Sequence, residues 1–261
     1  MGGEVFPEGS PFHGLCISSH EPLKAISKRY ICAGCLRSSR YFCYRCLLPP
    51  SCLQDSLPSI PLPLPLTIIK HVQELQGKST AVHAKLLAPV DTEILLFDPV
   101  LGIVDGRDLS DESGCVVLFP AETAEYVEDV DWSDVRRLVV IDGTWRQAKA
   151  MMISETLSRL SMRPIKLRET HRTTFWRYQS LGPHCLSTIE AIYRFYQELS
   201  LHQHGRVDVR LDNLLYLFTF FYDLIQKEYT VIRPDRKFTP KHRQADYIVA
   251  HPSSSTKLED K

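Results

Sequence analysis

Residues 137–145 read Arg-Leu-Val-Val-Ile-Asp-Gly-Thr-Trp, an apolar run that ends in a short polar turn. A continuous run of Val, Ile and Leu is typical of a strand that is covered on both faces, as strands in parallel sheets are. From Trp145 to residue 160 the composition predicts a helix. Strand, turn and helix in this order indicate one unit of an α/β fold.

The same alternation of apolar runs and helical stretches continues on both sides of this unit. We predict the other strands at residues 66–71, 93–97, 114–120 and 165–167. We predict the other helices at residues 79–87, 187–202 and 211–228. Ser187 and Glu190 have the spacing of a capping box at the start of the second of these helices. The fold class is therefore α/β, with a mostly parallel sheet and flanking helices.

The composition is that of an ordinary globular protein, with 44% hydrophobic and 24% charged residues in 261. No window holds the roughly eighteen apolar residues that a membrane-spanning helix needs, and the N-terminus lacks the apolar core of a signal peptide. We therefore expect an intracellular protein that is not secreted and has no membrane partner. In a reducing compartment, its eight cysteines are better interpreted as metal ligands and buried thiols than as disulfides.

A nucleotide-binding loop is excluded by its spacing. Gly77-Lys-Ser-Thr80 resembles the end of such a loop, but the glycine required at the start of the loop is replaced by Val72. The stretch also lacks a glycine-rich turn after a strand. We therefore do not expect an NTPase.

Four cysteines form two Cys-x-x-Cys pairs, Cys32-Ala-Gly-Cys35 and Cys43-Tyr-Arg-Cys46, separated by seven residues. Each pair forms a tight turn, and two such turns bring four thiolates together tetrahedrally around one zinc ion. Four thiolates leave no open coordination position, so the predicted zinc is structural rather than catalytic. The short separation predicts a compact knuckle that is closed by a hairpin at residues 40–42.

These features divide the chain into five segments. Residues 1–30 are predicted to form a mobile arm, and residues 31–48 the zinc knuckle. Residues 49–65 contain six prolines, which argue against a helix and predict an extended connector. The main domain is predicted at residues 66–230. Residues 231–261 are expected to form a basic, partly disordered tail.

The net charge is zero, but the charges are segregated along the chain. Residues 91–134 contain thirteen acidic residues and one basic residue. Residues 136–177 contain ten Lys or Arg and three acidic residues, a local excess of seven positive charges. Such a block can attract a polyanion whatever the total charge is. The alternative is that the two blocks neutralise each other in the fold.

The run Asp142-Gly-Thr-Trp145 resembles the Asp-x-Thr-Trp signature of the DTW-domain tRNA-uridine aminocarboxypropyltransferases. Four residues recur by chance, but several further blocks agree with this family, and with its eukaryotic branch, in the same order. The four-cysteine knuckle also precedes the domain, as in the family. The further blocks lie at residues 70–74, 77–81, 83–89, 175–177, 186–192 and 212–215.

The resemblance implies that S-adenosylmethionine donates its 3-amino-3-carboxypropyl group to N3 of a uridine in the tRNA D-loop, with methylthioadenosine as by-product. It also implies a knotted fold like that of the SPOUT methyltransferases, and a nuclear location, to which we add the cytoplasm as a second expected compartment. The expected partner is tRNA; no DNA partner is expected, and no protein partner is identified. Two rival functions stay open, a SPOUT-type RNA methyltransferase and a non-catalytic zinc-knuckle RNA-binding adaptor.

Three residues of the signature are the predicted catalytic residues. Asp142 is the candidate general base, because the uridine N3–H is only a weak acid; the alternative is that Asp142 caps the following helix. Thr144 is a candidate to hydrogen-bond the methionine part of the donor, or else a capping hydroxyl. Trp145 is a candidate to stack on adenine or to face the sulfonium, and the alternative is core packing.

Donor-binding residues are expected where strands end and helices begin, because free backbone groups face a ligand there. They are Phe119, Pro120, Glu122, Asp142, Gly143, Thr144, Trp145, Ser187, Thr188 and Glu190. RNA-binding residues are expected where cations alternate with aromatic rings, a composition suited to phosphates and a splayed base. They are Arg168, His171, Arg172, Phe175, Trp176 and Arg177. Core packing is the alternative for Phe175 and Trp176, and residues 233–243 are a second candidate phosphate clamp.

Overall fold

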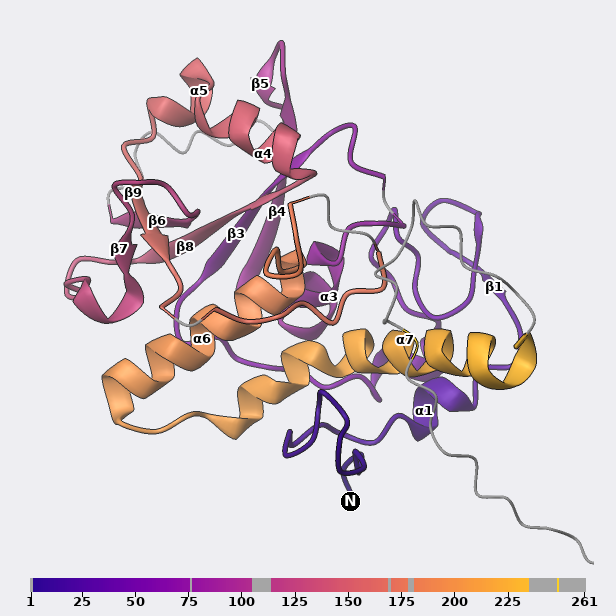
Figure 1. Cartoon of the computed structure of the whole chain (residues 1–261). Coiled ribbons are helices and arrows are strands. Elements are labelled where there is room, and N and C mark those ends of the chain that lie inside the picture. The colour runs from indigo at the N-terminus through magenta and orange to yellow at the C-terminus, as the bar shows by residue number, and fades with distance from the viewer. Residues whose placement is uncertain are drawn as a thin grey trace, which may run out of the picture.

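The structure is a computed structural model that describes residues 2–75, 77–104, 114–168, 170–177, 181–234 and 248. Its centre is a seven-stranded sheet with the order β5-β4-β3-β8-β6-β9-β7 (Figure 1). All neighbouring strands pair in parallel except β4 and β5. The strands are β3 (Leu66–His71), β4 (Thr92–Asp98), β5 (Gly102–Ile103), β6 (Cys115–Leu118), β7 (Glu125–Tyr126), β8 (Arg137–Asp142) and β9 (Arg163–Lys166). The predicted α/β class with a mostly parallel sheet is confirmed.

The middle of the sheet is formed by β3 and β8, and every residue of β3 is buried. Leu66 faces Leu138 in the register and Lys70 faces Asp142. Continuous apolar runs form these strands because both faces of the sheet are covered. The register places two polar residues, Lys70 and Asp142, side by side near the carboxyl ends of the two strands.

Helices cover the two faces of the sheet (Figure 1). One face packs against α4 (Trp145–Met152) and α5 (Glu155–Ser158), through a small core that includes Met151 and Leu157. The other face carries the larger core. Its helices are α3 (Ala81–Leu87), α6 (Thr188–His204) and α7 (Tyr216–Lys227). Short helical turns lie at η1 (Val127–Asp129), η2 (Val209–Leu215) and η3 (Glu228–Ile232).

Two of the predicted helices differ from the structure. The helix predicted at 145–160 is two helices, because the hydroxyl of Ser154 accepts a hydrogen bond from the backbone N–H of Leu157 and begins α5. The helix predicted at 211–228 begins with the 3₁₀ turn η2 and becomes α-helical only at Tyr216. The predicted capping box is present in α6, since the backbone N–H of Ser187 donates to Glu190 Oε2 over 2.8 Å.

The N-terminal segment is not the mobile arm that the sequence predicted. Phe12 is buried, and its ring contacts the ring of Tyr222 on α7 edge-to-face at 4.9 Å. The backbone N–H of Cys16 donates to Asp212 Oδ2 over 2.8 Å. After this stretch, α1 (Glu21–Lys24) lies beside α7 (Figure 1). Aromatic and apolar side chains therefore anchor the segment on the helical face of the domain.

The proline-rich connector also contains a helix, contrary to the prediction. The chain between Pro50 and Pro58 has no proline, and one short helix, α2 (Ser51–Gln54), forms there. Beyond it the chain is extended, as predicted, and Leu62 and Leu64 are buried in the larger core. The hydroxyl of Tyr196 on α6 donates to the backbone oxygen of Leu64 over 2.7 Å. The connector is therefore packed against the domain.

The knuckle hairpin lies earlier than the predicted residues 40–42. It pairs β1 (Tyr30–Ile31) with β2 (Ser38–Ser39) in antiparallel register. Most of the predicted basic tail, including all of residues 235–247, lies outside the described residues. In the described part of the chain, no helix has the length and apolar character to cross a membrane.

Candidate active site and metal centre

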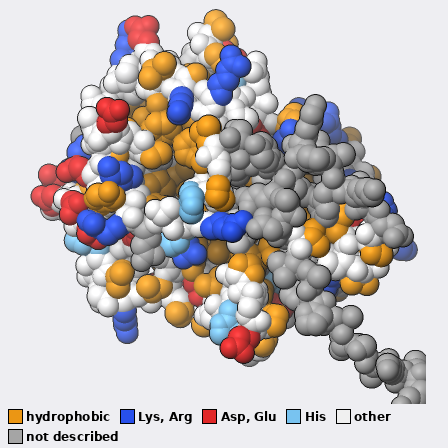
Figure 2. Space-filling model, in the orientation of Figure 1, with side chains coloured by type: hydrophobic (Ala, Val, Ile, Leu, Met, Phe, Trp, Pro, Cys, Tyr) orange, Lys and Arg blue, Asp and Glu red, His pale blue; other side chains and the backbone are white. Residues whose placement is uncertain are grey.

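A cavity of about 1040 Å³ opens at the carboxyl ends of β3, β8, β6 and β9, where the N-termini of α3 and α6 also meet. Ligands bind at this edge in parallel α/β sheets because loops and helix N-termini converge there. Figure 2 shows the hollow near the centre of this face, with an apolar floor and Lys, Arg and His side chains along its margin.

Asp142, the last residue of β8, lies in the cavity lining and is only 2% exposed. The hydroxyl of Ser79 donates to Asp142 Oδ2 over 2.7 Å, and the hydroxyl of Thr188 donates to Oδ1 over 2.6 Å. Burial raises the pKa of Asp142, whereas the two hydroxyls and the ammonium of Lys70 act to lower it. A carboxylate in this setting is a stronger base than one in water.

Helix capping, the alternative role for Asp142, falls to Thr144 instead. The backbone N–H of Gln147 donates to the hydroxyl of Thr144, and the backbone N–H of Thr144 donates to Gln147 Oε1, which forms a capping box. Thr144 therefore caps α4 and also lines the cavity. Gly143 is tightly enclosed, since a Cβ there would lie 3.2 Å from Gln147 Oε1. The turn thus leaves the Asp142 carboxylate free of the helix.

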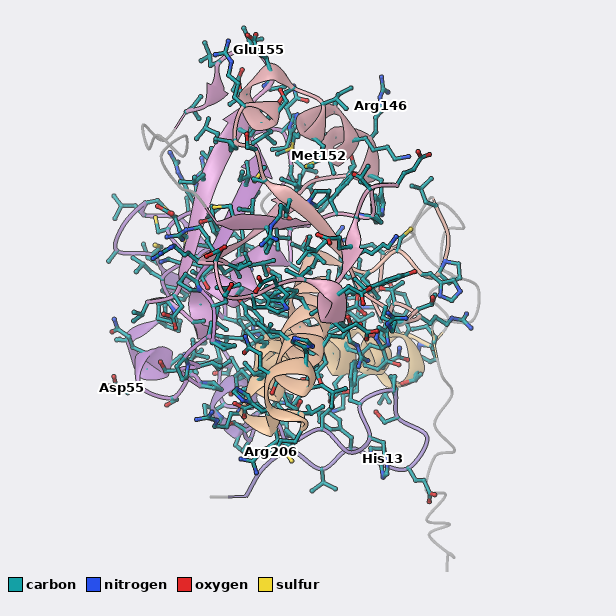
Figure 3. The ribbon with its side chains drawn as sticks, turned by 90° about the vertical axis from the view of Figure 1, so that its left-hand side faces the viewer. His13, Asp55, Arg146, Met152, Glu155 and Arg206 are labelled. Carbon is teal, nitrogen blue, oxygen red and sulfur yellow. The ribbon has the colours of Figure 1, made fainter. Side chains whose placement is uncertain are left out.

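Two aromatic rings form one wall of the cavity. The ring centroids of Trp145 and Phe119 lie 6.5 Å apart, at an angle of 47°. Trp145 is half-buried rather than packed in the core, while the next residue of α4, Arg146, projects outward (Figure 3). Pro120, Ser187 and Thr188 complete the predicted donor-binding residues that line the cavity.

The other two residues predicted to bind the donor do not line the cavity. Glu122 is exposed, because the chain after β6 turns away towards β7. Glu190 is buried behind the lining and accepts hydrogen bonds from the hydroxyls of Thr173, Thr174 and Ser187. The capping pattern of the sequence fits this structural role, in which Glu190 fixes the loop at 173–174 to the start of α6.

A second carboxylate, Glu74, lines the cavity and had no predicted role. Burial raises the pKa of Glu74, and the nearby charge of Asp142 raises it further. Ser79 and Thr80 were missed in the same way, although all three residues lie in the stretches that resemble the family. Only the resemblance to the family could have indicated these three residues, because the loop after β3 is polar and has no periodic pattern.

Of the predicted RNA-binding residues, all but Arg172 line the cavity. Arg168 forms ion pairs with Glu128 and Asp129, so here the acidic and basic blocks do neutralise each other in part. Phe175 is buried, with its ring 4.9 Å from that of Trp176, and Trp176 lies 5.3 Å from Phe218. Both aromatic residues therefore pack against the core as well as face the cavity. Arg172 is exposed.

The Arg177 side chain contacts the loop after β3, which is distant in sequence but lines the same cavity. Its Nη2 donates to the backbone oxygen of Gly77 over 2.8 Å. Its Nε–H is buried and has no acceptor within the described part of the chain. The cavity lining also includes Lys78, Lys166 and Arg168, so four Lys or Arg outnumber the two carboxylates, Glu74 and Asp142.

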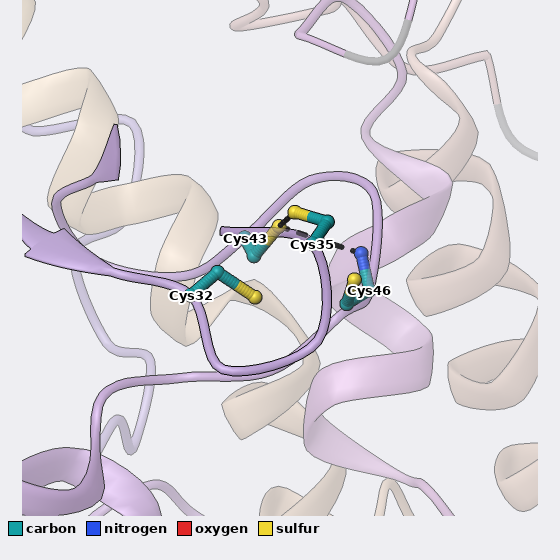
Figure 4. Close-up of side chains that lie close together, drawn as sticks. All are labelled: Cys32, Cys35, Cys43 and Cys46. Carbon is teal, nitrogen blue, oxygen red and sulfur yellow. Dashed lines mark hydrogen bonds between the residues drawn. The ribbon is translucent and has the colours of Figure 1, made fainter. Parts of the chain in front are cut away.

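The four predicted metal ligands converge in the knuckle. The sulfur atoms of Cys32, Cys35, Cys43 and Cys46 all lie within 4.8 Å of one another (Figure 4). Zinc–thiolate bonds of about 2.3 Å place the sulfurs of a tetrahedral site about 3.8 Å apart. The spacing of the thiols therefore fits a four-coordinate metal ion.

The two halves of the knuckle repeat the same local structure. The backbone N–H of Leu36 donates to the oxygen of Cys32, and that of Leu47 donates to the oxygen of Cys43, both over 2.8 Å. Leu36 and Leu47 both have positive φ angles, of 58° and 54°. A Cβ at Gly34 would lie 2.9 Å from Cys46 Sγ, so glycine is required for the close approach of the turns. Two matched turns of this kind hold thiolates around a metal.

Comparison with known proteins identifies the family. The DTW domain matches residues 40–226. The chain is 33% identical to tRNA-uridine aminocarboxypropyltransferase 1 of Mus musculus, over 83% of this chain and 84% of that protein. For the proteins of the same name, the identity is 32% in Homo sapiens, over 83% and 84% of the two chains, and 31% in Xenopus tropicalis, over 84% and 87%.

Among solved structures, the chain is similar to the SAM-dependent rRNA:acp-transferase Tsr3 from Vulcanisaeta distributa. That similarity has a TM-score of 0.41 at 20% identity and covers 64% of this chain and 80% of the other. The domain match alone extends over most of the sequence and includes both the cavity residues and the second half of the knuckle. The chain belongs to the DTW-domain family.

Proposed function

We propose that this protein transfers the 3-amino-3-carboxypropyl group of S-adenosylmethionine to N3 of a uridine in the D-loop of tRNA. The relatives in mouse, human and frog are named tRNA-uridine aminocarboxypropyltransferase 1, which supports this reaction. The observation that carries the proposal is the buried Asp142 carboxylate, held by two hydroxyls in the lining of the large cavity. A carboxylate with a raised pKa suits the removal of a proton from a weak acid.

The cavity has the size and chemistry for this donor. Its volume, about 1040 Å³, is at the upper end for small-molecule sites and leaves room for a flipped base beside the donor. The Trp145 and Phe119 rings offer faces for an adenine or a sulfonium cation. The carboxylates of Asp142 and Glu74 suit a cationic ligand as well.

S-adenosylmethionine supplies an activated carbon, which is the carbon of its aminocarboxypropyl chain that is bonded to the sulfonium sulfur. In the proposed step, Asp142 takes the N3 proton and the N3 electron pair forms the new bond to that carbon. The carbon–sulfur bond breaks towards sulfur, and methylthioadenosine leaves. The wall that contains Trp145 and Thr144 must hold the methyl carbon away from N3, because position alone separates this transfer from methyl transfer.

The cationic side chains that line the cavity are suited to contacts with the phosphates of the RNA. Lys78, Lys166 and Arg177 line it, and the D-loop is single-stranded, so its bases leave the stack at low cost. We propose His171, Phe175 and Trp176 as further contacts, with Arg168 and Arg172 at the margin. Zinc is the proposed ion of the knuckle, because four clustered cysteine thiolates are a ligand set typical of structural zinc. The proposed location is the nucleus.

A double-label experiment tests the reaction. Purified protein is incubated with unmodified tRNA and with S-adenosylmethionine labelled either in the methyl group or in the aminocarboxypropyl carbons. The proposal predicts that only the second label enters the tRNA, in a uridine of the D-loop. Label from the methyl group would identify a methyltransferase instead, and tRNA binding without either label would identify a non-catalytic adaptor.

A further inference from the structure

The surface of the knuckle is strongly basic. Residues 24–54 contain six Lys or Arg and no Asp or Glu. Five of the six lie on the knuckle and its approach, and all five are exposed. We call them the knuckle cations: Lys28, Arg29, Arg37, Arg40 and Arg45. Within the described part of the chain, none of them forms an ion pair, so their charge is not neutralised by the fold.

A zinc ion bound by the four thiolates would cancel only part of this charge. Four thiolates and one divalent ion would carry a net charge of −2, which leaves about three of the five charges of the knuckle cations uncompensated. A purely structural knuckle gains nothing from such repulsion. The concentration of like charge is therefore better explained by an anionic partner.

Four of the knuckle cations converge on one recess. Arg29, Arg37, Arg40 and Arg45 line a cavity of about 220 Å³, together with the rings of Tyr41 and Tyr44. The guanidinium of Arg29 is fixed by Ser38, to whose hydroxyl its Nε donates over 2.8 Å. The guanidinium of Arg40 lies over the Tyr41 ring, 5.1 Å from its centre.

Arg37 and Arg45 differ from these two fixed arginines. Neither side chain has a hydrogen bond or ring contact to any described residue. Their guanidinium groups are therefore available to bind phosphate oxygens in the bidentate geometry that arginine favours. Fixed and available arginines beside aromatic rings are the composition of an RNA-backbone site.

The recess lies beside the active-site cavity. Tyr44 lines the recess and lies near Arg177, which lines the larger cavity. The ring centroid of Phe221, which lines the recess, lies 6.3 Å from that of Trp176, which lines the larger cavity. An RNA strand that leaves the cavity past Arg177 therefore meets the knuckle next.

We propose that the knuckle cations form a second docking surface for tRNA, which binds backbone phosphates away from the target uridine. The proposal rests on the proposed function, which makes tRNA the substrate. Arg37 and Arg45 are the residues that distinguish it, because their replacement disturbs no contact within the described fold.

Binding and kinetics of the double variant Arg37→Gln/Arg45→Gln test the proposal. The matched control is Arg136→Gln/Arg206→Gln, which removes two exposed arginines elsewhere. Arg136 lies at the amino end of β8, opposite the cavity, and Arg206 follows α6 at the lower end of the molecule (Figure 3). Zinc content and thermal unfolding of each variant establish that the knuckle is intact.

Affinity for full-length unmodified tRNA is measured without donor over a range of salt concentrations. We expect the knuckle variant to bind about tenfold more weakly at 0.1 M salt, and the slope of log K against log salt to fall by about 1 to 2, as for two lost phosphate contacts. We expect the control to match the wild-type chain. With full-length tRNA the KM should rise while kcat stays the same, and with an isolated D-arm hairpin neither value should change.

Wild-type affinity and salt slope in the knuckle variant would overturn the proposal, as would an equal loss of affinity for the hairpin. An equal loss of tRNA affinity in the control variant would show that only the overall charge matters, and would also overturn the proposal. The binding assay needs no catalysis. If tRNA affinity depends on the knuckle but the wild-type chain transfers no aminocarboxypropyl group, the proposed function is refuted and the docking surface stands. If the chain transfers the group but tRNA affinity does not depend on the knuckle, the docking surface is refuted and the proposed function stands.

Discussion

The hydroxyl of Thr188, the first residue of α6, donates a 2.6 Å hydrogen bond to Oδ1 of Asp142, the last residue of β8. Ser79, at the approach to α3, donates to the other carboxylate oxygen. Two helix starts from distant parts of the chain thus hold one carboxylate. This arrangement stabilises the ionised form of Asp142 against the burial that favours its protonated form.

Replacing Thr188 with Val should shift the pH dependence of transfer. The Thr188 hydroxyl lowers the pKa of Asp142, so its loss raises that pKa further. A general base works when ionised, and its contribution is lost as pH falls through its pKa. We therefore expect the acidic limb of the kcat/KM profile to move to higher pH in Thr188→Val. Thr123→Val, at an exposed hydroxyl away from the cavity, should leave the profile unchanged; an equal shift in both variants, or none in Thr188→Val, would remove Asp142 as the base.

Replacing Trp145 tests the aromatic wall. A cation–π contact to a sulfonium contributes about 0.5–2 kcal/mol, so Trp145→Ala should raise the KM for the donor about 2- to 30-fold. Trp145→Phe keeps an aromatic ring, so its KM for the donor should lie between those of the wild-type chain and Trp145→Ala. Donor affinity measured by calorimetry, with circular dichroism to verify folding, provides the comparison. Unchanged donor affinity in Trp145→Ala would exclude this ring from the donor site.

The hydrophobic pattern of the sequence was sufficient to predict the main strands of the sheet, but not the segments that pack around it. The strand 66–71 was predicted at its observed limits, because an apolar run bounded by Pro65 and a polar loop can form little else. The N-terminal segment was missed, since Phe12 is an isolated aromatic whose partners on α7, Phe218 and Tyr222, lie about two hundred residues later. Local propensity carries no information about such contacts.

The candidate site shows the same division. Asp142 stands at a strand end and was predicted, whereas Glu74 and Ser79 occupy a loop without periodicity and gain their role only from the fold. Glu190 was assigned to the donor although its capping pattern already accounted for it. A residue that satisfies a local rule is therefore best given that local role first.

Replacing one knuckle cysteine should release the metal. Cys46→Ser leaves three thiolates, and we expect the zinc content to fall from about one ion per chain towards none. We also expect a loss of about 3 kcal/mol in unfolding free energy, which is about 10 °C in melting temperature for a chain of this size. Cys52→Ser is the control, since Cys52 is exposed and lies outside the cluster. Equal metal content in the two variants by mass spectrometry would contradict the knuckle site.

Stability at acid pH should depend on His83. This residue of α3 lies between Phe42 of the knuckle and Phe221 of α7, and complete burial lowers its pKa to about 3. In the unfolded chain a histidine takes up its proton near pH ~6.5, so folding stability is lost progressively as pH falls from ~6.5 towards that folded value.

The variant His83→Phe removes the imidazole that takes up this proton on unfolding. Between pH ~6.5 and ~4.5, the slope of unfolding free energy against pH should fall by about one proton, as measured by urea titration at several pH values. Burial also lowers the pKa of His20, to about 4, so part of the slope remains. His13→Phe, at an exposed histidine, should keep the full slope. A wild-type slope in His83→Phe would mean that His83 is protonated in the folded chain.

The identity of the nucleoside by-product tests the reaction at Asp142 most directly. Wild-type protein, tRNA and S-adenosylmethionine should yield methylthioadenosine in a one-to-one ratio to modified uridine, quantified by liquid chromatography and mass spectrometry. Asp142→Asn should lower that yield by about 10² to 10⁴, the range for a lost general base. Release of S-adenosylhomocysteine by the wild-type chain, or an undiminished yield of methylthioadenosine from Asp142→Asn, would contradict the proposed reaction or the proposed base.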